Sequence, residues 1–305
     1  MSRKNPLMDA VVVTYNRLDK LKNCIAAINA QSVAVRFIHV VDNNSSDGTK
    51  EWLLENAERL NIIPHILDYN GGGAGGFNVG IKAAYNAGAD WTWVMDDDVY
   101  PKLDCLKALV ESSFFHSHTQ GTREIGFLAS RVEWVDGSIC LMNIPVLNWP
   151  PNASFHEAKS SLPLTSSSFV SCFISRVGVE RVGLPVKEFF IWCDDTEYTR
   201  RLSKNFDCYY LDDSVVIHDT PSNNLPDYSQ VTHQNLWKYK CEIRNVAAIE
   251  AVASGKSKKI RALRQVLKNS KKAYRATRDF KIFKALLLSG IRGAFWDYKK
   301  HIEHV

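Results

Sequence analysis

The chain has 305 residues, enough for one large α/β domain with an appendage, and its 45% hydrophobic and 23% charged residues are typical of a folded globular protein. This composition excludes disordered and collagen-like chains, and no apolar run approaches the ~20 residues that a membrane-spanning helix needs. The net charge of +5 is uneven: residues 256–305 hold 15 Lys and Arg against 3 Asp and Glu, which leaves a net −7 for the rest. A basic C-terminal region therefore follows an acidic main body.

The seven cysteines are an odd number without C-x-x-C spacing, and no secretory leader precedes them. This pattern predicts reduced thiols in a cytoplasmic protein.

The first hundred residues alternate between short apolar, β-branched runs and helical patterns, as parallel strands joined by crossover helices do. In chain order the pattern predicts strands over 10–14, 37–41, 62–67 and 91–95, and helices over 19–31, from about 50, and over 79–87, with the glycine run 71–76 before the last of these helices. We interpret this part as a nucleotide-binding half.

The second half is less regular. Residues 125–190 mix short strands with a serine-rich stretch, a helix follows the acidic pair at 194–195, and residues 212–218 indicate a last strand. From residue 236 onward, apolar residues recur at three- and four-residue spacing, which predicts a helical C-terminal region with a break at Gly255.

Three consecutive carboxylates, Asp96, Asp97 and Asp98, follow the strand at 91–95, at the sheet edge where open parallel sheets bind ligands. On an extended segment Asp96 and Asp98 point to one face and Asp97 to the other. Such a pair suits Mg²⁺ or Mn²⁺ bound together with a diphosphate. The alternative is a solvated acidic turn, but three adjacent carboxylates repel one another unless a cation offsets them.

A second carboxylate pair, Asp194 and Asp195, follows an aromatic-rich run. Desolvation and mutual repulsion would raise the pKa of one of them toward a value suited to a general base. The pair also fits a helix start, with Glu197 in the first turn, and both interpretations can hold at once. His218, at the end of the last strand, is a third candidate metal ligand, although a histidine at a strand end is more often structural.

The glycine run either lets backbone approach a ligand closely or forms a flexible turn. It matches neither a Walker A loop nor a dinucleotide fingerprint.

Taken together, these segments resemble the family 2 glycosyltransferases. The resemblance rests on Val12-Val13-Thr14-Tyr15-Asn16-Arg17, the segment from Val41 to Thr49, the glycine run, Asp96 to Asp98, and Trp192 to Tyr198, in this order. It covers about residues 9–245 and is closest to galactofuranosyl- and rhamnosyltransferases. It implies the GT-A fold, an α/β domain over residues 1–235 built on a mostly parallel sheet with flanking helices, followed by the basic helical region 236–305. The nucleotide-sugar half would occupy about 8–105 and the acceptor half about 106–235.

The resemblance also implies roles for individual residues. Asp195 would be the catalytic base with Asp194 beside it, and Asp96, Asp98 and His218 would bind a divalent metal, Mn²⁺ or Mg²⁺. The nucleotide sugar would be bound by Thr14, Tyr15, Arg17, Asp42, Asn44, Gly75, Gly76, Asn78, Asp96, Asp97 and Arg244. The chain departs from the family at Val79, where a basic residue is usual, and at Cys193, where an aromatic residue is usual.

The implied function is inverting, metal-dependent transfer of galactofuranose from UDP-galactofuranose to a glycan, expected to be lipid-linked, in the synthesis of a surface polysaccharide such as O-antigen or cell wall. Rhamnose transfer from dTDP-rhamnose is the alternative that shares these motifs. A nucleotide-sugar pyrophosphorylase is an alternative of another class, but it would carry a glycine-rich signature on the first strand-to-helix turn. This chain has Thr14 to Arg17 there instead, which argues against that class. A carbohydrate-binding or nucleotide-sugar-binding protein without transferase activity would not need Asp96, Asp98 and Asp195 together.

Residues 256–300 alternate cations with apolar residues at helical spacing. This pattern fits a helix that lies on an anionic membrane, here the inner face of the cell membrane, and fits equally a solvated helical hairpin packed on the domain. Nucleic-acid binding is not expected, because the rest of the chain is acidic.

Overall fold

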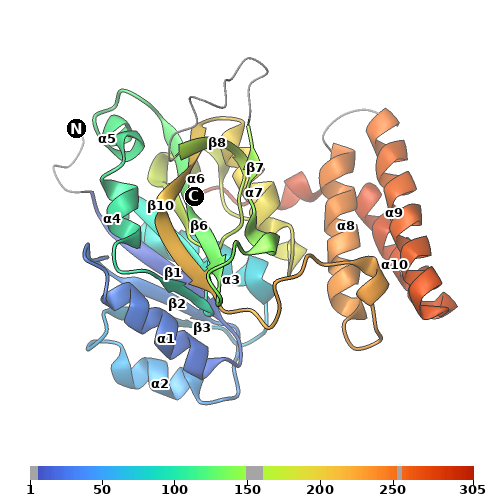
Figure 1. The fold of residues 1–305 in the computed structure, drawn as a ribbon, viewed down its shortest axis with the longest axis horizontal. Helices are drawn as coiled ribbons and strands as arrows, with labels where there is room; N and C mark the ends of the chain where they lie inside the picture. Colours follow the sequence, from blue (N-terminus) through green and yellow to red (C-terminus); the bar gives the residue numbers. More distant parts are fainter. Residues whose placement is uncertain (1–5, 149–160, 253–255) are drawn as a thin grey trace.

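A mixed ten-stranded sheet separates two layers of helices in the larger part of the molecule (Figure 1). The computed structural model describes residues 6–148, 161–252 and 256–305. One side of the sheet is parallel, in the order β3 (Ile62–Ile66), β2 (Ile38–Asp42), β1 (Met8–Thr14) and β4 (Trp91–Asp96). The order continues through β9 (Cys172–Ser175), β6 (Ile125–Trp134), β10 (Asp207–His218), β8 (Ser161–Ser166) and β7 (Val146–Leu147), and β5 (Val99–Pro101) pairs with β10.

The strands of the second half run in both directions. β9 is antiparallel to its neighbours β4 and β6, while β6 and β10 are parallel to each other. The α/β class is confirmed, and the predicted parallel arrangement holds for the N-terminal half. β10 begins five residues earlier than the predicted strand at 212, because residues 207–211 also pair with β6 and β8.

Both faces of the central strands are buried, which explains their continuous apolar runs. Ala10 and Val12 of β1 join one core cluster and Val11 and Val13 the other. The first cluster is covered by α1 (Leu18–Asn29), α2 (Thr49–Asn56), α4 (Cys105–Val110) and α5 (Ser113–Thr119). The second is covered by α3 (Gly72–Asn86), α6 (Arg176–Val182) and α7 (Asp194–Ser203).

The glycine run is helical from Gly72 onward, so of its two interpretations the flexible turn is wrong. α3 begins at Gly72 rather than near residue 79. A Cβ at Gly76 would lie 2.4 Å from Val13, and one at Gly80 would lie 2.3 Å from Val11. These glycines therefore let the helix pack directly on β1.

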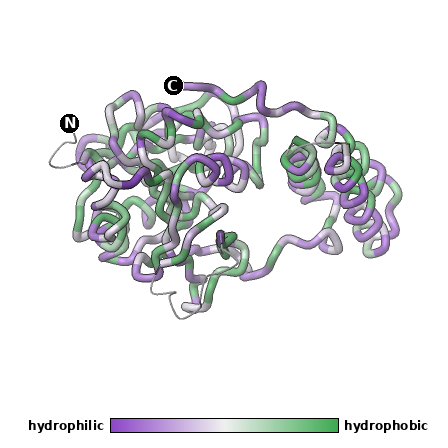
Figure 2. The backbone as a smooth tube through the Cα atoms, turned by 90° about the horizontal axis from the view of Figure 1, so that it is seen from above, coloured by the Kyte–Doolittle hydropathy of each residue, from purple (hydrophilic) through white to green (hydrophobic). Residues whose placement is uncertain are grey.

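The C-terminal region forms a separate helical bundle of α8 (Leu236–Val252), α9 (Lys256–Thr277) and α10 (Phe280–Ala294). Figure 2 shows these helices with apolar sides facing one another and hydrophilic sides outward. Their core includes Tyr239, Ile243, Val266 and Leu286. The break predicted at Gly255 lies outside the described residues. No helix in the described ranges is both long and apolar enough to cross a membrane.

After the bundle, the chain returns to the α/β part. The short helix Tyr298–His301 is followed by Glu303, whose carbonyl accepts a hydrogen bond of 2.8 Å from the backbone of Leu184. Tyr298 joins a small core cluster with Phe189 of the α/β part and Ala248 of α8.

We predict that Gly80→Ala destabilises the protein by about 1–3 kcal/mol, because the added methyl group must displace Val11 or move α3 away from β1. Gly73→Ala is the matched control in the same helix, since a Cβ there meets nothing within 4 Å. The free energy of unfolding of Gly73→Ala should differ from that of the native protein by less than about 1 kcal/mol. Thermal unfolding of both variants measures the difference, and equal melting temperatures would contradict this account of the glycines.

Candidate active site

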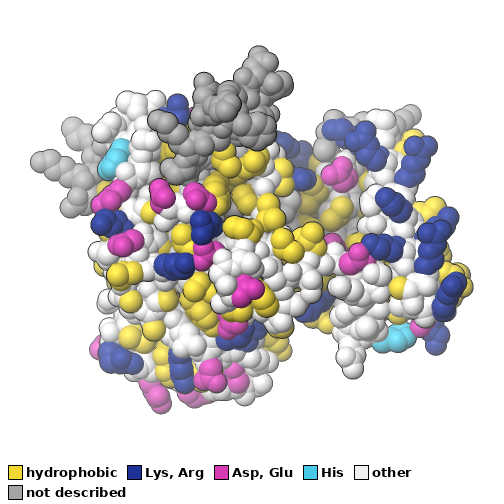
Figure 3. Space-filling view, viewed as in Figure 1, with side chains coloured by type: hydrophobic (Ala, Val, Ile, Leu, Met, Phe, Trp, Pro, Cys, Tyr) yellow, Lys and Arg dark blue, Asp and Glu magenta, His cyan; other side chains and the backbone are white. Residues whose placement is uncertain are grey.

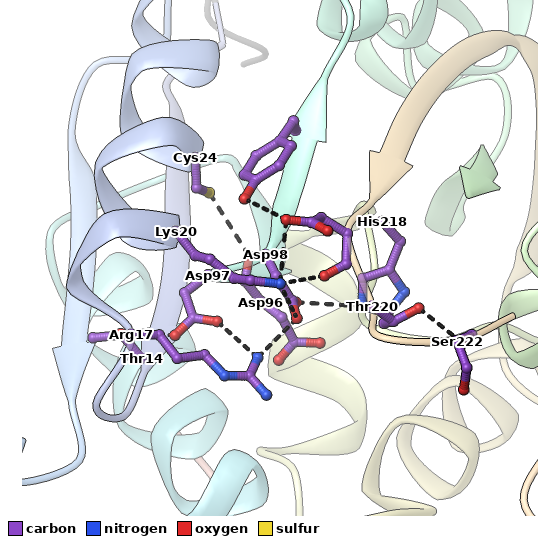
Figure 4. Close-up of polar contacts among 12 residues, drawn as sticks. Thr14, Arg17, Lys20, Cys24, Asp96, Asp97, Asp98, His218, Thr220 and Ser222 are labelled. Atoms are coloured by element: carbon purple, nitrogen blue, oxygen red, sulfur yellow. Dashed lines mark hydrogen bonds and ion pairs between the residues drawn. The ribbon is translucent and has the colours of Figure 1, made fainter. Parts of the chain in front are cut away.

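A tight turn between β4 and β5 carries three carboxylates (Figure 4). Asp96 ends β4, and Asp97 and Asp98 form the turn. β5 then pairs with β10 so that Val99 lies opposite His218, and this register places Nε2 of His218 3.3 Å from Oδ1 of Asp98. One ligand atom from each of Asp96, Asp98 and His218 lies within 4.8 Å of the others. Two carboxylates and an imidazole in this arrangement are suited to hold a divalent cation.

Basic and hydroxyl groups from the first βα connection neutralise the same turn. Nη1 of Arg17 lies 3.2 Å from Oδ1 of Asp97 and 2.7 Å from Oδ2 of Asp98. The Thr14 hydroxyl donates a 2.8 Å hydrogen bond to Asp97. Nζ of Lys20, a residue without a sequence signal for this role, lies 4.0 Å from Oδ2 of Asp98. β1 and β4 are neighbours in the sheet, and this brings the two loops together.

The four titratable groups of the cluster have shifted pKa values. Burial, reinforced by the charge of Asp98, raises the pKa of Asp96 to about 7. Burial raises the pKa of Asp97 to about 6, against the opposing effect of Arg17. For Asp98 the effect of burial is outweighed by the hydrogen bond with His218, so its pKa lies below the ordinary value. Burial opposes ionisation of His218, but its hydrogen bond with Asp98 raises its pKa to about 9. A divalent cation would take the place of the imidazolium proton, since metal binding needs a neutral ring.

The His218 ring is held in place by Asn143, a residue that no sequence signal marked. Oδ1 of Asn143 lies 2.8 Å from Nδ1 of His218, and Asn143 is buried at the end of the short helix Leu141–Asn143. A hydrogen-bond partner on Nδ1 orients the ring so that Nε2 faces Asp98.

Asp42 is placed for contact with a ligand. It ends β2 directly beside Thr14, and it is fully buried. Its Oδ1 accepts a 3.0 Å hydrogen bond from the backbone of Ser45, whereas its buried Oδ2 has no partner among the described residues. A buried carboxylate oxygen without a donor indicates that a bound molecule supplies one. Tyr15 and Asn44, also predicted to bind the nucleotide sugar, lie exposed in the two loops that flank this position.

Other predicted nucleotide-sugar residues support the protein's own backbone. Gly76 packs against Val13, and the Asn78 amide donates a 2.8 Å hydrogen bond to the carbonyl of Pro185. Space for a ligand remains at Gly75, where a Cβ would meet nothing within 4 Å. Arg244 is not brought to the acidic turn. Its guanidinium donates hydrogen bonds of 2.8 and 3.0 Å to the carbonyls of Glu188 and Phe189.

The second carboxylate pair begins α7. Burial raises the pKa of both Asp194 and Asp195, and the charges of Asp195 and Asp96 raise that of Asp194 further. The two acidic pairs therefore lie within electrostatic reach of each other. Asp195 lines a small pocket together with Asn143, which contacts His218, and with the serines at 166–168. Asn143 therefore lies between this pocket and His218.

The segment before Asp194 has a strained backbone. Positive φ angles, which are unusual outside glycine, occur at Phe190 (65°), Trp192 (64°) and Cys193 (69°). Each such conformation costs on the order of 1 kcal/mol or more and persists where surrounding contacts enforce it. The enforcing residue is Asn245 of α8, fully buried, whose amide donates hydrogen bonds of 2.8 to 3.1 Å to the carbonyls of Phe189, Ile191 and Trp192. Together with Arg244, it fixes the direction in which the chain enters α7.

A comparison with known families agrees with this geometry. The model of "Glycosyl transferase family 2" matches residues 9–176, more than half of the chain. The protein belongs to glycosyltransferase family 2. Galactofuranosyltransferase GlfT1 of Mycobacterium tuberculosis is 27% identical to it over 213 residues, which cover 64% of each chain. GlfT1 of Mycolicibacterium smegmatis is 27% identical over 212 residues, 64% of this chain and 65% of the relative. The matched region thus spans slightly less than two thirds of these relatives.

Solved structures share the fold of this family 2 chain. Staphylococcus aureus TarS superimposes with a TM-score of 0.55 and 15% identity, covering 93% of this chain and 55% of TarS. The mannosyltransferase PcManGT of Pyrobaculum calidifontis, solved with GDP-Man and Mn²⁺, has a TM-score of 0.54 and 14% identity, covering 97% of this chain and 82% of its own. The predicted GT-A fold is confirmed.

We predict that Asn245→Ala lowers the rate of sugar transfer at least tenfold while the affinity for the nucleotide stays within about threefold, because three carbonyls each lose one hydrogen bond and the entry into α7 relaxes. Steady-state kinetics give kcat and KM separately. Asn205→Ala is the matched control, since that exposed amide donates to a single carbonyl, that of Arg201. An Asn245→Ala enzyme that melts lower but keeps its kcat would show that the contact is only structural.

Proposed function

We propose that this protein transfers galactofuranose from UDP-galactofuranose to a glycan acceptor, with inversion at the anomeric carbon. The observation that carries the proposal is that Asp195 lines one pocket together with Asn143, whose side chain contacts His218, one of the three candidate metal ligands. The relatives named as galactofuranosyltransferases support the choice of sugar.

The donor would lie at the carboxyl ends of β1, β2 and β4. The free oxygen of Asp42 would accept a hydrogen bond from the uridine, and Thr14, Tyr15 and Arg17 would border the same pocket. Asp96, Asp98 and His218 would hold the divalent metal, Mn²⁺ or Mg²⁺, which supplies positive charge to the departing diphosphate. Arg17 already balances Asp97 and Asp98 and would add to this positive field.

The acceptor would enter from the second half of the sheet. The serines at 166–168 and Thr196 line the pocket beside Asp195 and offer hydroxyl groups for a sugar. Asp195 takes the proton of one acceptor hydroxyl as that oxygen forms its bond to the anomeric carbon. The bond from this carbon to the diphosphate breaks on the opposite side, and UDP leaves. One displacement needs one base, so no covalent enzyme intermediate forms. A lipid-linked glycan of a surface polysaccharide is the acceptor that we propose.

We predict that Asp195→Asn reduces transfer at least a thousandfold and leaves UDP binding within about threefold, because the amide keeps the shape of the side chain and cannot accept the proton. Transfer is measured with radiolabelled donor, and UDP binding by calorimetry. Asp213→Asn, which changes an exposed aspartate in β10, is the control and should keep full activity. Loss of UDP affinity as large as the loss of rate would count against the role of Asp195.

The choice of donor is tested by thermal shifts with UDP, dTDP, GDP and ADP, each with Mn²⁺ or with EDTA. We expect UDP to raise the melting temperature with Mn²⁺ and to raise it less with EDTA. In Asp98→Asn the shift with UDP should be the same with Mn²⁺ and with EDTA, since that variant lacks one of the three metal ligands. Stabilisation by dTDP alone would assign rhamnose as the sugar. The absence of any shift would contradict nucleotide-sugar binding itself.

A further inference from the structure

α9 combines an unusual charge with a clear division of faces. Its 22 residues include nine Lys and Arg and no Asp or Glu. Ala262, Val266, Ser270 and Ala273 are buried and face the other two helices. The opposite face therefore points away from the bundle, and Figure 1 shows α9 at its outer edge.

Cations occupy this outer face without partners. Arg264, Lys268, Lys271 and Arg275 are spaced by four, three and four residues, so they form one exposed stripe along the helix. None of them makes an ion pair or hydrogen bond with the described residues, in contrast to Lys272, whose ammonium pairs with Asp227. Like charges at these spacings destabilise a helix unless an external anion offsets them.

Exposed apolar side chains run beside the basic stripe. Ile260, Leu267 and Tyr274 are spaced by seven residues and are 51%, 39% and 38% exposed. Each is followed four residues later by a cation, at Arg264, Lys271 and Arg278 respectively. The neighbouring helix α10 also exposes apolar side chains: Phe280 and Leu288 are 64% and 45% exposed, and Phe295 after α10 is 67% exposed. Figure 3 shows dark blue cationic side chains with yellow apolar ones among them along this edge.

The geometry points to an anionic lipid bilayer as the partner of this surface: we propose that α9 lies flat on it, with the basic stripe on the phosphates and the apolar line in the interfacial zone. A straight helix of 22 residues presents a contact line of about 33 Å. Cations beside exposed apolar side chains match a surface that is both anionic and apolar. Nucleic acid fits less well, because Ile260, Leu267 and Leu288 cannot stack on bases.

This docking does not depend on the proposed transfer reaction. The contact would hold the protein at the membrane through α9 and α10 alone, while the candidate active site lies in the α/β part. A vesicle-binding assay therefore reports on the surface whether or not galactofuranose is the substrate.

The test is cosedimentation of the full chain with phosphatidylcholine vesicles and with vesicles containing 30% phosphatidylglycerol. Three proteins are compared: the native chain, a variant with Arg264, Lys268, Lys271 and Arg275 changed to Gln, and a control of equal net charge. The control changes four cations of the α/β part to Gln: the half-buried Lys22 and the exposed Lys50, Arg59 and Lys204. UDP binding and the melting temperature show that each variant is folded.

We expect the native chain and the control to bind the anionic vesicles and not the neutral ones, and the α9 variant to bind at least about a hundredfold more weakly, since each cation near an anionic surface contributes about fivefold. In addition, Leu267→Ser with Ile260→Ser should weaken binding at high salt, where the charge contribution is screened. Equal binding by the α9 variant and the control would overturn the proposal. Two other results would also overturn it: no pelleting of the native chain with either kind of vesicle, or a native dimer that the α9 variant alone disrupts.

Discussion

The structure depends on keeping three adjacent carboxylates at the end of β4 without unfolding the sheet around them. Two like charges 4 Å apart repel by about 4 kcal/mol at the effective dielectric of a protein surface. Arg17 reaches the turn from the loop after β1, and His218 reaches it from the end of β10. Neither residue is near Asp96 in sequence. The strand order is what allows this neutralisation, since it puts β1 beside β4 and pairs β5 with β10.

A second constraint links the two halves of the site. Segment 188–193 is strained, and it lies between the start of α3 and the start of α7. The carbonyl of Phe190 accepts a 3.1 Å hydrogen bond from the backbone of Ala74, and it lies so close to Gly72 that a Cβ there would be only 2.0 Å away. Asn245 holds the same segment from the side of α8. The helical bundle therefore helps to build the site, and the two faces of the bundle differ: α8 supports the site, whereas α9 presents its cations outward.

Most of the fold followed from local patterns. The apolar strands, the crossover helices and the helical C-terminal region were predicted from the spacing of apolar residues. A strand buried on both faces has a continuous apolar run, and a helix buried on one face has apolar residues every three or four positions. The helix that begins within the glycine run was not predicted, since nothing in the run shows that Val13 of β1 lies directly against Gly76. Propensity alone disfavours four glycines among the first five residues of a helix, and tertiary packing overrides that preference.

The sequence by itself determined which chemical groups stand at strand ends and at a helix start: three aspartates from the last residue of β4 onward, a histidine at the end of β10 and an acidic pair at the start of α7. These positions are local properties of the chain. Only the tertiary structure decided which groups meet. It paired His218 with Asn143, gave Lys20 a place beside Asp98, and bound Arg244 to backbone carbonyls rather than placing it at the acidic turn. Such contacts depend on strand order, register and helix packing, which are set by residues far apart in the sequence.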